Sequence, residues 1–306
     1  MSNKPKILVT GSNGQLGMEL QVLAPLYKEY EFVFLSKEKL PLQNPDLARD
    51  TFLKQQPQFL INCGAYTAVD KAETEKDLAF QVNGEAVGTL AALCKEYQCR
   101  FIHISTDYVF DGTATSPYKE DALTNPQSVY GASKLKGEKL AMQSNEESII
   151  IRTSWVYSSF GKNFVKTMLK LMSERSELNV VNDQLGSPTY AADLAEVILQ
   201  IIRQFPIHDS HNRERSVAAR FTTSSGIFHF SNSGNISWFD FALAIRELSG
   251  SKCNVHPIPT SAYPTPAKRP AYSVLDKTKI QETFGVGLND WKESLVRCIQ
   301  LLDDSR

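Results

Sequence analysis

Lys6-Ile-Leu-Val-Thr-Gly-Ser-Asn-Gly-Gln-Leu-Gly17 is the stretch that decides the fold of this chain. Its first five residues form an apolar run between polar neighbours, as in a strand buried on both faces of a parallel sheet. Three glycines follow in G-x-x-G-x-x-G spacing, and helical periodicity begins at Met18. Glycines in such a turn let the backbone approach a pyrophosphate, whose charge meets the free N–H groups of the helix N-terminus. The turn predicts a dinucleotide site made by Gly11, Asn13, Gly14, Gln15, Leu16 and Gly17.

Strand and helix patterns alternate after this unit. Apolar runs predict strands at 6–10, 31–35, 59–62, 100–105, 148–152 and 178–181. Helical periodicity predicts helices at 18–26, 45–54, 77–97, 129–143 and 163–173. This alternation is typical of βαβ units, so we expect an α/β fold with a Rossmann-like, doubly wound parallel sheet.

The pattern loosens beyond Val181. Helices are predicted at 190–205, 237–249 and 291–302, a strand at 226–230, and largely extended chain across the five prolines of 256–270. The polar segment 207–223 has the composition of a surface loop or a disordered excursion. We expect an NAD(P)-binding domain over 1–181, to which 190–230 partly returns, and a smaller C-terminal α/β lobe over 182–306.

The overall composition narrows the class of protein. A net charge of −1, from 33 basic and 34 acidic residues, gives no basic patch or acidic tail for nucleic acid or a membrane surface. No apolar run reaches the length of about 18 residues that spans a bilayer, and the polar start resembles no signal peptide. Five cysteines without C-x-x-C spacing indicate reduced thiols. We therefore expect a cytoplasmic globular protein.

Tyr130-Gly-Ala-Ser-Lys134 is the main catalytic candidate. On a helix, residues four apart share one face. A free tyrosine titrates near pH ~10, and an ammonium one turn away favours the phenolate. The Tyr130 hydroxyl is therefore expected to act as a general acid or base near pH ~7. Alone, the Y-x-x-x-K spacing is a weak signal that more often marks a solvated helix face.

Further candidate residues lie at three predicted strand ends. Ser36 and Lys37 follow the second strand. Their hydroxyl and ammonium groups suit the 2′-phosphate of NADPH better than the bare ribose diol of NADH. Lys37 is also compatible with an ordinary exposed lysine. Thr106 ends the fourth strand, at the edge where open α/β sheets bind ligands. Its hydroxyl can donate to a substrate carbonyl beside Tyr130, or simply cap the next loop. Trp155, after the fifth strand, is either core or a pocket wall.

Together these segments resemble the extended short-chain dehydrogenase/reductases and, among them, the family of dTDP-4-dehydrorhamnose reductases. The glycine turn, Asn83 with Gly88-Thr89, Ser105-Thr106-Asp107 and Tyr130-x-x-x-Lys134 occur in the expected order. More specific are Tyr66-Thr-Ala-Val-Asp-Lys-Ala-Glu73, Ser105-Thr-Asp-Tyr-Val-Phe-Asp-Gly112, Asn182-Asp-Gln-Leu-Gly-Ser-Pro-Thr-Tyr190, Ser237-Trp-Phe-Asp240 and Arg269-Pro. The likeness covers nearly the whole chain except 207–223.

The resemblance implies the roles of individual residues. It implies NADPH, with NADH as the alternative cofactor, reducing the 4-keto group of dTDP-4-dehydro-L-rhamnose to the alcohol. Tyr130 would be the proton donor, Lys134 would lower its pKa and bind the nicotinamide ribose, and Thr106 would hold the reacting oxygen. The remaining implied cofactor contacts are Cys63, Gly64, Ala65 and Asn83. The implied substrate contacts are Thr67, Val69, Tyr108 and Trp155, with Asn163 and Arg269 for the diphosphate.

Two departures bear on these roles. Members of the family often carry an acidic residue near the positions filled here by Leu40-Pro41-Leu42, so recognition of the adenine side is open. Some members are described with magnesium at a dimer interface, but no acidic ligands for it map onto this chain, and we predict no metal. The implied partner is a dTDP-sugar, with neither nucleic acid nor membrane, and the resemblance admits a homodimer.

Other functions stay open at this point. A sugar-nucleotide 4,6-dehydratase needs a second carboxylate after Asp107, where this chain has Tyr108. A 4-epimerase needs only hydride removal and return, and the match at 66–73 argues against it. The chain also resembles the regulatory β-subunit of methionine adenosyltransferase, a non-catalytic binding module. Those subunits tend to lose the threonine that this chain retains at Thr106.

Overall fold

A parallel sheet forms the centre of the computed structural model, which describes residues 4–205 and 224–303. Among these residues the sheet has six strands in the order β10-β5-β4-β3-β1-β2. The strands are β1 Lys6–Thr10, β2 Glu31–Leu35, β3 Phe59–Asn62, β4 Arg100–Thr106, β5 Ile149–Thr153 and β10 Gly226–His229. The predicted doubly wound fold is confirmed, while the segment 207–223 lies outside the described residues.

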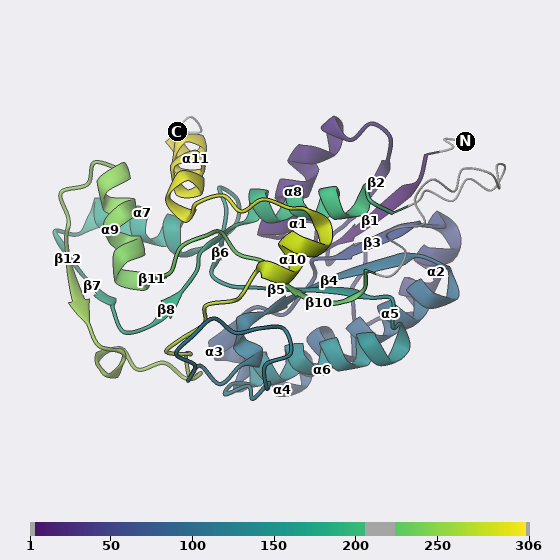
Figure 1. Ribbon diagram of the computed structural model, residues 1–306, viewed down its shortest axis with the longest axis horizontal. Helices are drawn as coiled ribbons and strands as arrows, with labels where there is room; N and C mark the ends of the chain where they lie inside the picture. Colours follow the sequence, from purple (N-terminus) through teal and green to yellow (C-terminus); the bar gives the residue numbers. More distant parts are fainter. Residues whose placement is uncertain (1–3, 206–223, 304–306) are drawn as a thin grey trace.

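Helices cover both faces of this sheet (Figure 1). Because successive side chains of a strand point to opposite faces, Ile7 and Val9 join one hydrophobic cluster and Leu8 joins another. The first cluster includes side chains of α1 Gln15–Leu23, α8 Ala191–Ile202 and α10 Thr278–Phe284. The second includes side chains of α2 Pro45–Gln55, α5 Ala86–Glu96 and α6 Val129–Ser144. The inner strands β1, β3, β4 and β5 are thus buried on both faces, which explains their continuous apolar runs in the sequence.

A smaller lobe packs beside the sheet around its own hydrophobic cluster, which includes Val165, Phe241 and Leu295 (Figure 1). Its helices are α7 Phe164–Glu174, α9 Trp238–Leu248 and α11 Trp291–Asp303, and its parallel strand pair is β7 Glu177–Val181 with β12 Asn254–Ile258. Ser237 caps α9 through a capping box with Asp240. The described residues also contain two short strand pairs. In one pair β6 Val156–Tyr157 lies beside β9 Thr189–Tyr190, and in the other β8 Leu185–Gly186 lies beside β11 Ile236–Ser237.

Several boundaries differ from the prediction. Helix α1 begins at Gln15 rather than Met18, because the Gly14 carbonyl already accepts from the Met18 N–H at 2.9 Å. The strand predicted at 178–181 pairs with β12 and not with the central sheet. The helix predicted at 77–97 is divided into α4 Lys76–Phe80, a π-helical turn Gln81–Glu85 and α5. Sequence periodicity missed the short helices α3 Val69–Ala72 and α10, and the 3-10 turns Ala24–Leu26, Asp107–Val109 and Thr260–Ala262.

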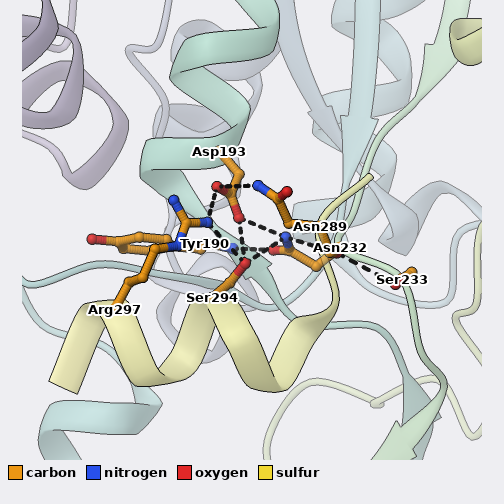
Figure 2. Close-up of polar contacts among 7 residues, drawn as sticks. All are labelled: Tyr190, Asp193, Asn232, Ser233, Asn289, Ser294 and Arg297. Carbon is orange, nitrogen blue, oxygen red and sulfur yellow. Dashed lines mark hydrogen bonds and ion pairs between the residues drawn. The ribbon is translucent and has the colours of Figure 1, made fainter. Parts of the chain in front are cut away.

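The buried carboxylate of Asp193 in helix α8 binds side chains of the smaller lobe (Figure 2). The Asp193 side chain is only 2% exposed. It accepts hydrogen bonds from Asn232 Nδ2 at 2.6 Å, Ser294 Oγ at 2.5 Å and Asn289 Nδ2 at 2.9 Å, and it forms an ion pair with Arg297. These partners come from α11 and from two loops far along the chain. The charge is therefore fully hydrogen-bonded, which is the condition for burying a carboxylate without a large penalty.

Candidate active site

The glycine turn lies where the strand order reverses, between the carboxyl ends of β1 and β3. Gly11 has φ +63°, and a Cβ there would lie 2.6 Å from the Gly64 nitrogen. A Cβ on Gly17 would lie 2.5 Å from the Gly11 carbonyl oxygen. No side chain caps the start of α1, so its first N–H groups are available to an anion. The backbone cradle therefore fits the pyrophosphate of a dinucleotide.

The carboxyl end of β2 carries the residues predicted to select the cofactor. Ser36 is buried, and Lys37 is exposed. The Ser36 hydroxyl hydrogen-bonds the carboxylate of Glu38 and holds the pKa of that carboxyl below its usual value. Sequence reasoning missed Glu38, although its position directly after the predicted strand end was a signal. Leu42 packs towards Gly64, where an added Cβ would lie 2.7 Å from the leucine Cδ1.

Close packing of α6 brings Tyr130 to the end of β4. Ser128 caps the helix by accepting from the Gly131 N–H at 3.1 Å. A Cβ on Gly131 would lie 2.2 Å from the Tyr108 carbonyl oxygen, so only glycine permits this approach. The Tyr130 and Tyr108 rings meet edge to face, with centroids 5.5 Å apart. The Thr106 hydroxyl accepts from the Tyr108 N–H at 3.3 Å and so also fills the capping role considered above.

The environment of Tyr130 favours the protonated phenol. Burial raises the pKa of Tyr130 to about 12, against the opposing effect of its hydrogen bond with Thr106, and the Asp107 carboxylate raises it further. The expectation of a lowered pKa is thus wrong for this structure, because desolvation outweighs the stabilisation of the phenolate. At neutral pH the hydroxyl is protonated and suited to donate a proton.

Lys134 is buried one turn further along α6, and its side chain turns towards β4. Its Nζ donates to the Ile104 carbonyl at 2.6 Å and lies 3.2 Å from His103 Nε2. Burial lowers the pKa of Lys134 to about 8, against the opposing charge of Glu138. The groups that shift the pKa of Tyr130 do not include Lys134.

The loop after β3 is held by Asn83 in the π-helical turn. The Asn83 amide accepts from the Tyr66 N–H at 2.8 Å and donates to the Tyr66 carbonyl at 2.9 Å and to Ser133 Oγ at 3.0 Å. Such π-helical turns frequently occur at functional sites. Asn83 thus fixes the loop that carries the predicted contacts Cys63, Gly64, Ala65, Thr67 and Val69. Burial raises the pKa of the Cys63 thiol, so this thiol is protonated at neutral pH.

A cavity of about 940 Å³ is lined by Asp70 of α3, by Tyr108 in the turn after β4 and by residues of the smaller lobe. Tyr108 and Arg269, both predicted substrate contacts, line it. Its other lining residues include Asp70, Phe164, Arg175, Asn179, Gln184 and Trp238, to which sequence reasoning gave no role. Trp238 stood in a segment quoted for the resemblance, and its place at a helix start was the available signal.

Arg269 lines this cavity, and an ion pair with Asp70 orients its guanidinium. Arg269 Nη2 lies 2.7 Å from Asp70 Oδ2, and the Ala267 N–H donates to Asp70 Oδ1 at 3.2 Å. Arg269 Nη1 is buried without a hydrogen-bond partner among the described residues. A buried guanidinium nitrogen with a free donor is a site for an anionic oxygen.

Trp155 and Asn163, both predicted to contact substrate, contact other side chains of the protein in this structure. Trp155, with the unusual φ of +48°, stacks on Trp238 at 3.6 Å and supports the cavity wall. Asn163 caps α7 by accepting from the Lys166 N–H at 3.1 Å, and it donates to Gln15 Oε1 at 2.9 Å. The structure thus brings Thr106, Tyr108, Tyr130 and Arg269 into one region, and links Asn163 to the start of α1. Their predicted contacts with substrate stay predictions.

Neither a membrane helix nor a metal cluster is found in the described part of the chain. None of its helices is long and apolar enough to cross a bilayer. Within residues 4–205 and 224–303, no three His, Cys, Asp or Glu side chains gather in a way that could hold a metal ion.

Comparison with known proteins gives matches over nearly the whole chain. The family model described as "RmlD substrate binding domain" matches residues 5–303. A dTDP-4-dehydrorhamnose reductase of Burkholderia thailandensis is 43% identical over 304 residues, covering 96% of this chain and 98% of that protein. One of Aggregatibacter actinomycetemcomitans is 40% identical over 296 residues, covering 95% and 97%. The crystal structure of the Bacillus anthracis enzyme in complex with NADP is 36% identical, with a TM-score of 0.88 and coverage of 97% and 99%.

Proposed function

This chain belongs to the RmlD substrate binding domain family, and from that premise we propose that it is an NADPH-dependent dTDP-4-dehydrorhamnose reductase. It reduces the 4-keto group of dTDP-4-dehydro-L-rhamnose and yields dTDP-L-rhamnose. The main support for this proposal is the full-length match to reductases, combined with a half-buried Tyr130 whose phenol is protonated beside Thr106.

The residues have distinct roles in this reaction. NADPH, when bound, supplies the hydride, and the backbone of the glycine turn holds its pyrophosphate. Tyr130 donates its phenolic proton to the oxygen on carbon 4 as negative charge develops there. The Thr106 hydroxyl donates its single hydrogen to Asp107 Oδ1 at 3.0 Å in this structure. In the reaction this hydroxyl turns to donate to the oxygen on carbon 4. Lys134 would provide a cation to bind the nicotinamide ribose.

Further proposals concern the two units of the chain, its compartment in the cell and its oligomeric state. Residues 1–181, with 190–230 partly returning, bind the cofactor, and 182–306 mainly bind the sugar nucleotide. Separate hydrophobic clusters in the sheet and in the smaller lobe support two units, but Val165 and Leu178 belong to the cluster of the smaller lobe and Ile280 to that of the sheet, so the packing does not follow the boundary at 181. Five free cysteines are consistent with work in the reducing cytoplasm. The chain acts as a monomer or a homodimer, which light scattering will distinguish.

The direct test is oxidation of NADPH, followed by absorbance, with freshly made dTDP-4-dehydro-L-rhamnose. We expect substrate-dependent loss of NADPH and formation of dTDP-L-rhamnose, identified by mass and by comparison with the authentic sugar nucleotide. An epimerase would interconvert sugar nucleotides without net loss of NADPH. A regulatory module would bind NADPH and turn over neither substrate, and either result would refute the proposal.

Cofactor preference provides a prediction for the end of β2. If Ser36 and Lys37 bind the 2′-phosphate, the double variant Ser36→Asp, Lys37→Ala loses a charge-assisted contact and gains a carboxylate for the ribose diol. The ratio of kcat/KM for NADPH to that for NADH is then expected to fall by about 10- to 100-fold. Lys39→Ala, which removes another exposed lysine of the same turn, is the control. An equal ratio in all three proteins would contradict the assignment.

Substrate recognition provides a prediction for Arg269. Arg269→Met keeps the aliphatic length but removes the free guanidinium donor at the cavity. We expect KM for the dTDP-sugar to rise by about 10- to 100-fold, as for a lost hydrogen bond to a charged group, while KM for NADPH stays unchanged. Lys268→Met, at the neighbouring exposed position, is the matched control. Equal rises in both KM values would point to a general structural defect instead.

A further inference from the structure

A chain of buried polar side chains extends from the Lys134 ammonium into the sheet. His103 Nε2 lies 3.2 Å from Lys134 Nζ, and His103 Nδ1 lies 3.0 Å from the Asn62 amide. The same amide is 2.6 Å from the Thr10 hydroxyl. Thr10, Asn62 and His103 are completely buried, and Lys134 is 2% exposed. Strands β1, β3 and β4 therefore place three polar side chains in line behind Lys134, and the reaction described above assigns none of them a role.

The imidazole of His103 is neutral. Burial holds its pKa well below the usual value, and the Lys134 charge lowers it further. A neutral imidazole has one N–H donor and one acceptor nitrogen. If Nδ1 carries the hydrogen, Nε2 accepts from the Lys134 ammonium. If Nε2 carries it, the N–H points at Lys134 Nζ, which can accept only after losing its own proton. The charge of Lys134 and the tautomer of His103 are therefore coupled.

Asn62 can serve either tautomer. Its amide oxygen and nitrogen occupy nearly equal positions, so a half-turn of the amide presents the oxygen to the His103 Nδ1–H. The amide nitrogen then donates to Thr10 Oγ1. With Lys134 charged, this arrangement gives an acceptor to the Lys134 ammonium, to the His103 Nδ1–H and to the Asn62 N–H, while the Thr10 hydroxyl gives up its bond to Asn62 Oδ1. The opposite orientation places two N–H groups against each other, which is costly in a buried site.

We propose that His103 is a positioning residue for the reduction: its neutral imidazole accepts a hydrogen bond from the Lys134 ammonium and so fixes that ammonium in place and keeps it charged. The proposal rests on the function proposed above for Tyr130 and Lys134. The other groups that face Lys134 are the Ile104 carbonyl, the Cys63 thiol and the Glu138 carboxylate. Glu138 is itself engaged by Arg152, and burial keeps the Cys63 thiol neutral. His103 is thus the side-chain acceptor that contacts Lys134.

The dependence of kcat/KM on pH tests this role. Lys134 carries its charge below its pKa of about 8, so in the wild type the rate is expected to fall as pH rises through that value. His103→Leu removes the acceptor, and the alkaline limb should move to lower pH by about one unit. His103→Gln retains a carbonyl acceptor and should keep the limb near its wild-type position. A lower rate in His103→Leu with an unmoved limb would indicate a merely structural role and overturn the proposal.

A measurement on the wild-type protein keeps the proposal testable if His103→Leu fails to fold. Nitrogen-15 NMR of labelled histidine distinguishes the two tautomers, and the His103 signal is assigned by its absence in His103→Gln. We expect the Nδ1–H tautomer at neutral pH and a change to Nε2–H as Lys134 deprotonates. An Nε2–H tautomer or an imidazolium at neutral pH would contradict the hydrogen bond. Since this measurement needs no turnover, its outcome is separate from the success or failure of the proposed reductase activity.

Discussion

Tyr130→Phe is expected to lower kcat for reduction of the keto-sugar by about 10²- to 10⁴-fold, the usual contribution of a positioned general acid. The variant removes the hydroxyl and leaves the half-buried ring against Tyr108. With a pKa of about 12, the wild-type phenol is protonated throughout the pH range in which Lys134 is charged. Without it, the developing alkoxide has no acid in contact.

Steady-state kinetics will measure this loss, and fluorescence titration with NADPH will show whether cofactor binding persists. Tyr97→Phe removes a hydroxyl from a half-buried tyrosine at the end of α5, which packs against Phe52 away from the site, and should change neither quantity. The expected pattern is a lower kcat with unchanged NADPH affinity and unchanged thermal unfolding. Turnover of Tyr130→Phe at the wild-type rate would exclude Tyr130 as the proton donor.

Arg152→Met is expected to destabilise the fold by roughly 3–5 kcal/mol, the usual cost of leaving one member of a buried ion pair without its partner. Arg152 and Glu138 are each 2% exposed and make two hydrogen bonds, at 2.9 and 2.7 Å. The Glu138 carboxylate also accepts from Ser105 Oγ at 2.5 Å. The pair and Ser105 therefore connect α6, β4 and β5. Ser105 is next to Thr106 in β4, and Glu138 is one turn after Lys134 in α6. The expected fall in melting temperature is on the order of 10 °C.

Denaturant and thermal unfolding measure this effect, and a double variant identifies its cause. Glu138→Leu combined with Arg152→Met removes both charges, so it should recover much of the stability lost by Arg152→Met alone. Arg49→Met breaks the exposed pair with Glu96 and should shift the transition little. If the double variant is less stable than Arg152→Met by the full cost of a second substitution, the unpaired charge is not the cause.

The local pattern of the chain determined the elements of the fold. Continuous apolar runs give the strands of the sheet and a period of 3.6 residues gives the helices that cover it, since both patterns are set by residues close in sequence. The glycine turn, the Tyr130–Lys134 spacing and the Ser237 cap are also local, so each could be identified without neighbours. The resemblance that these motifs carried is confirmed by the family match.

Tertiary structure decided the properties that depend on distant partners. Asp70 and Arg269 meet across 199 residues of sequence, Trp155 stacks on Trp238, and β7 pairs in the smaller lobe instead of the central sheet. The raised pKa of Tyr130 belongs here too, because it follows from desolvation by the whole surrounding structure. Propensity and periodicity are properties of adjacent residues. Burial, close approach and hydrogen-bond partners exist only after segments remote in sequence have packed together.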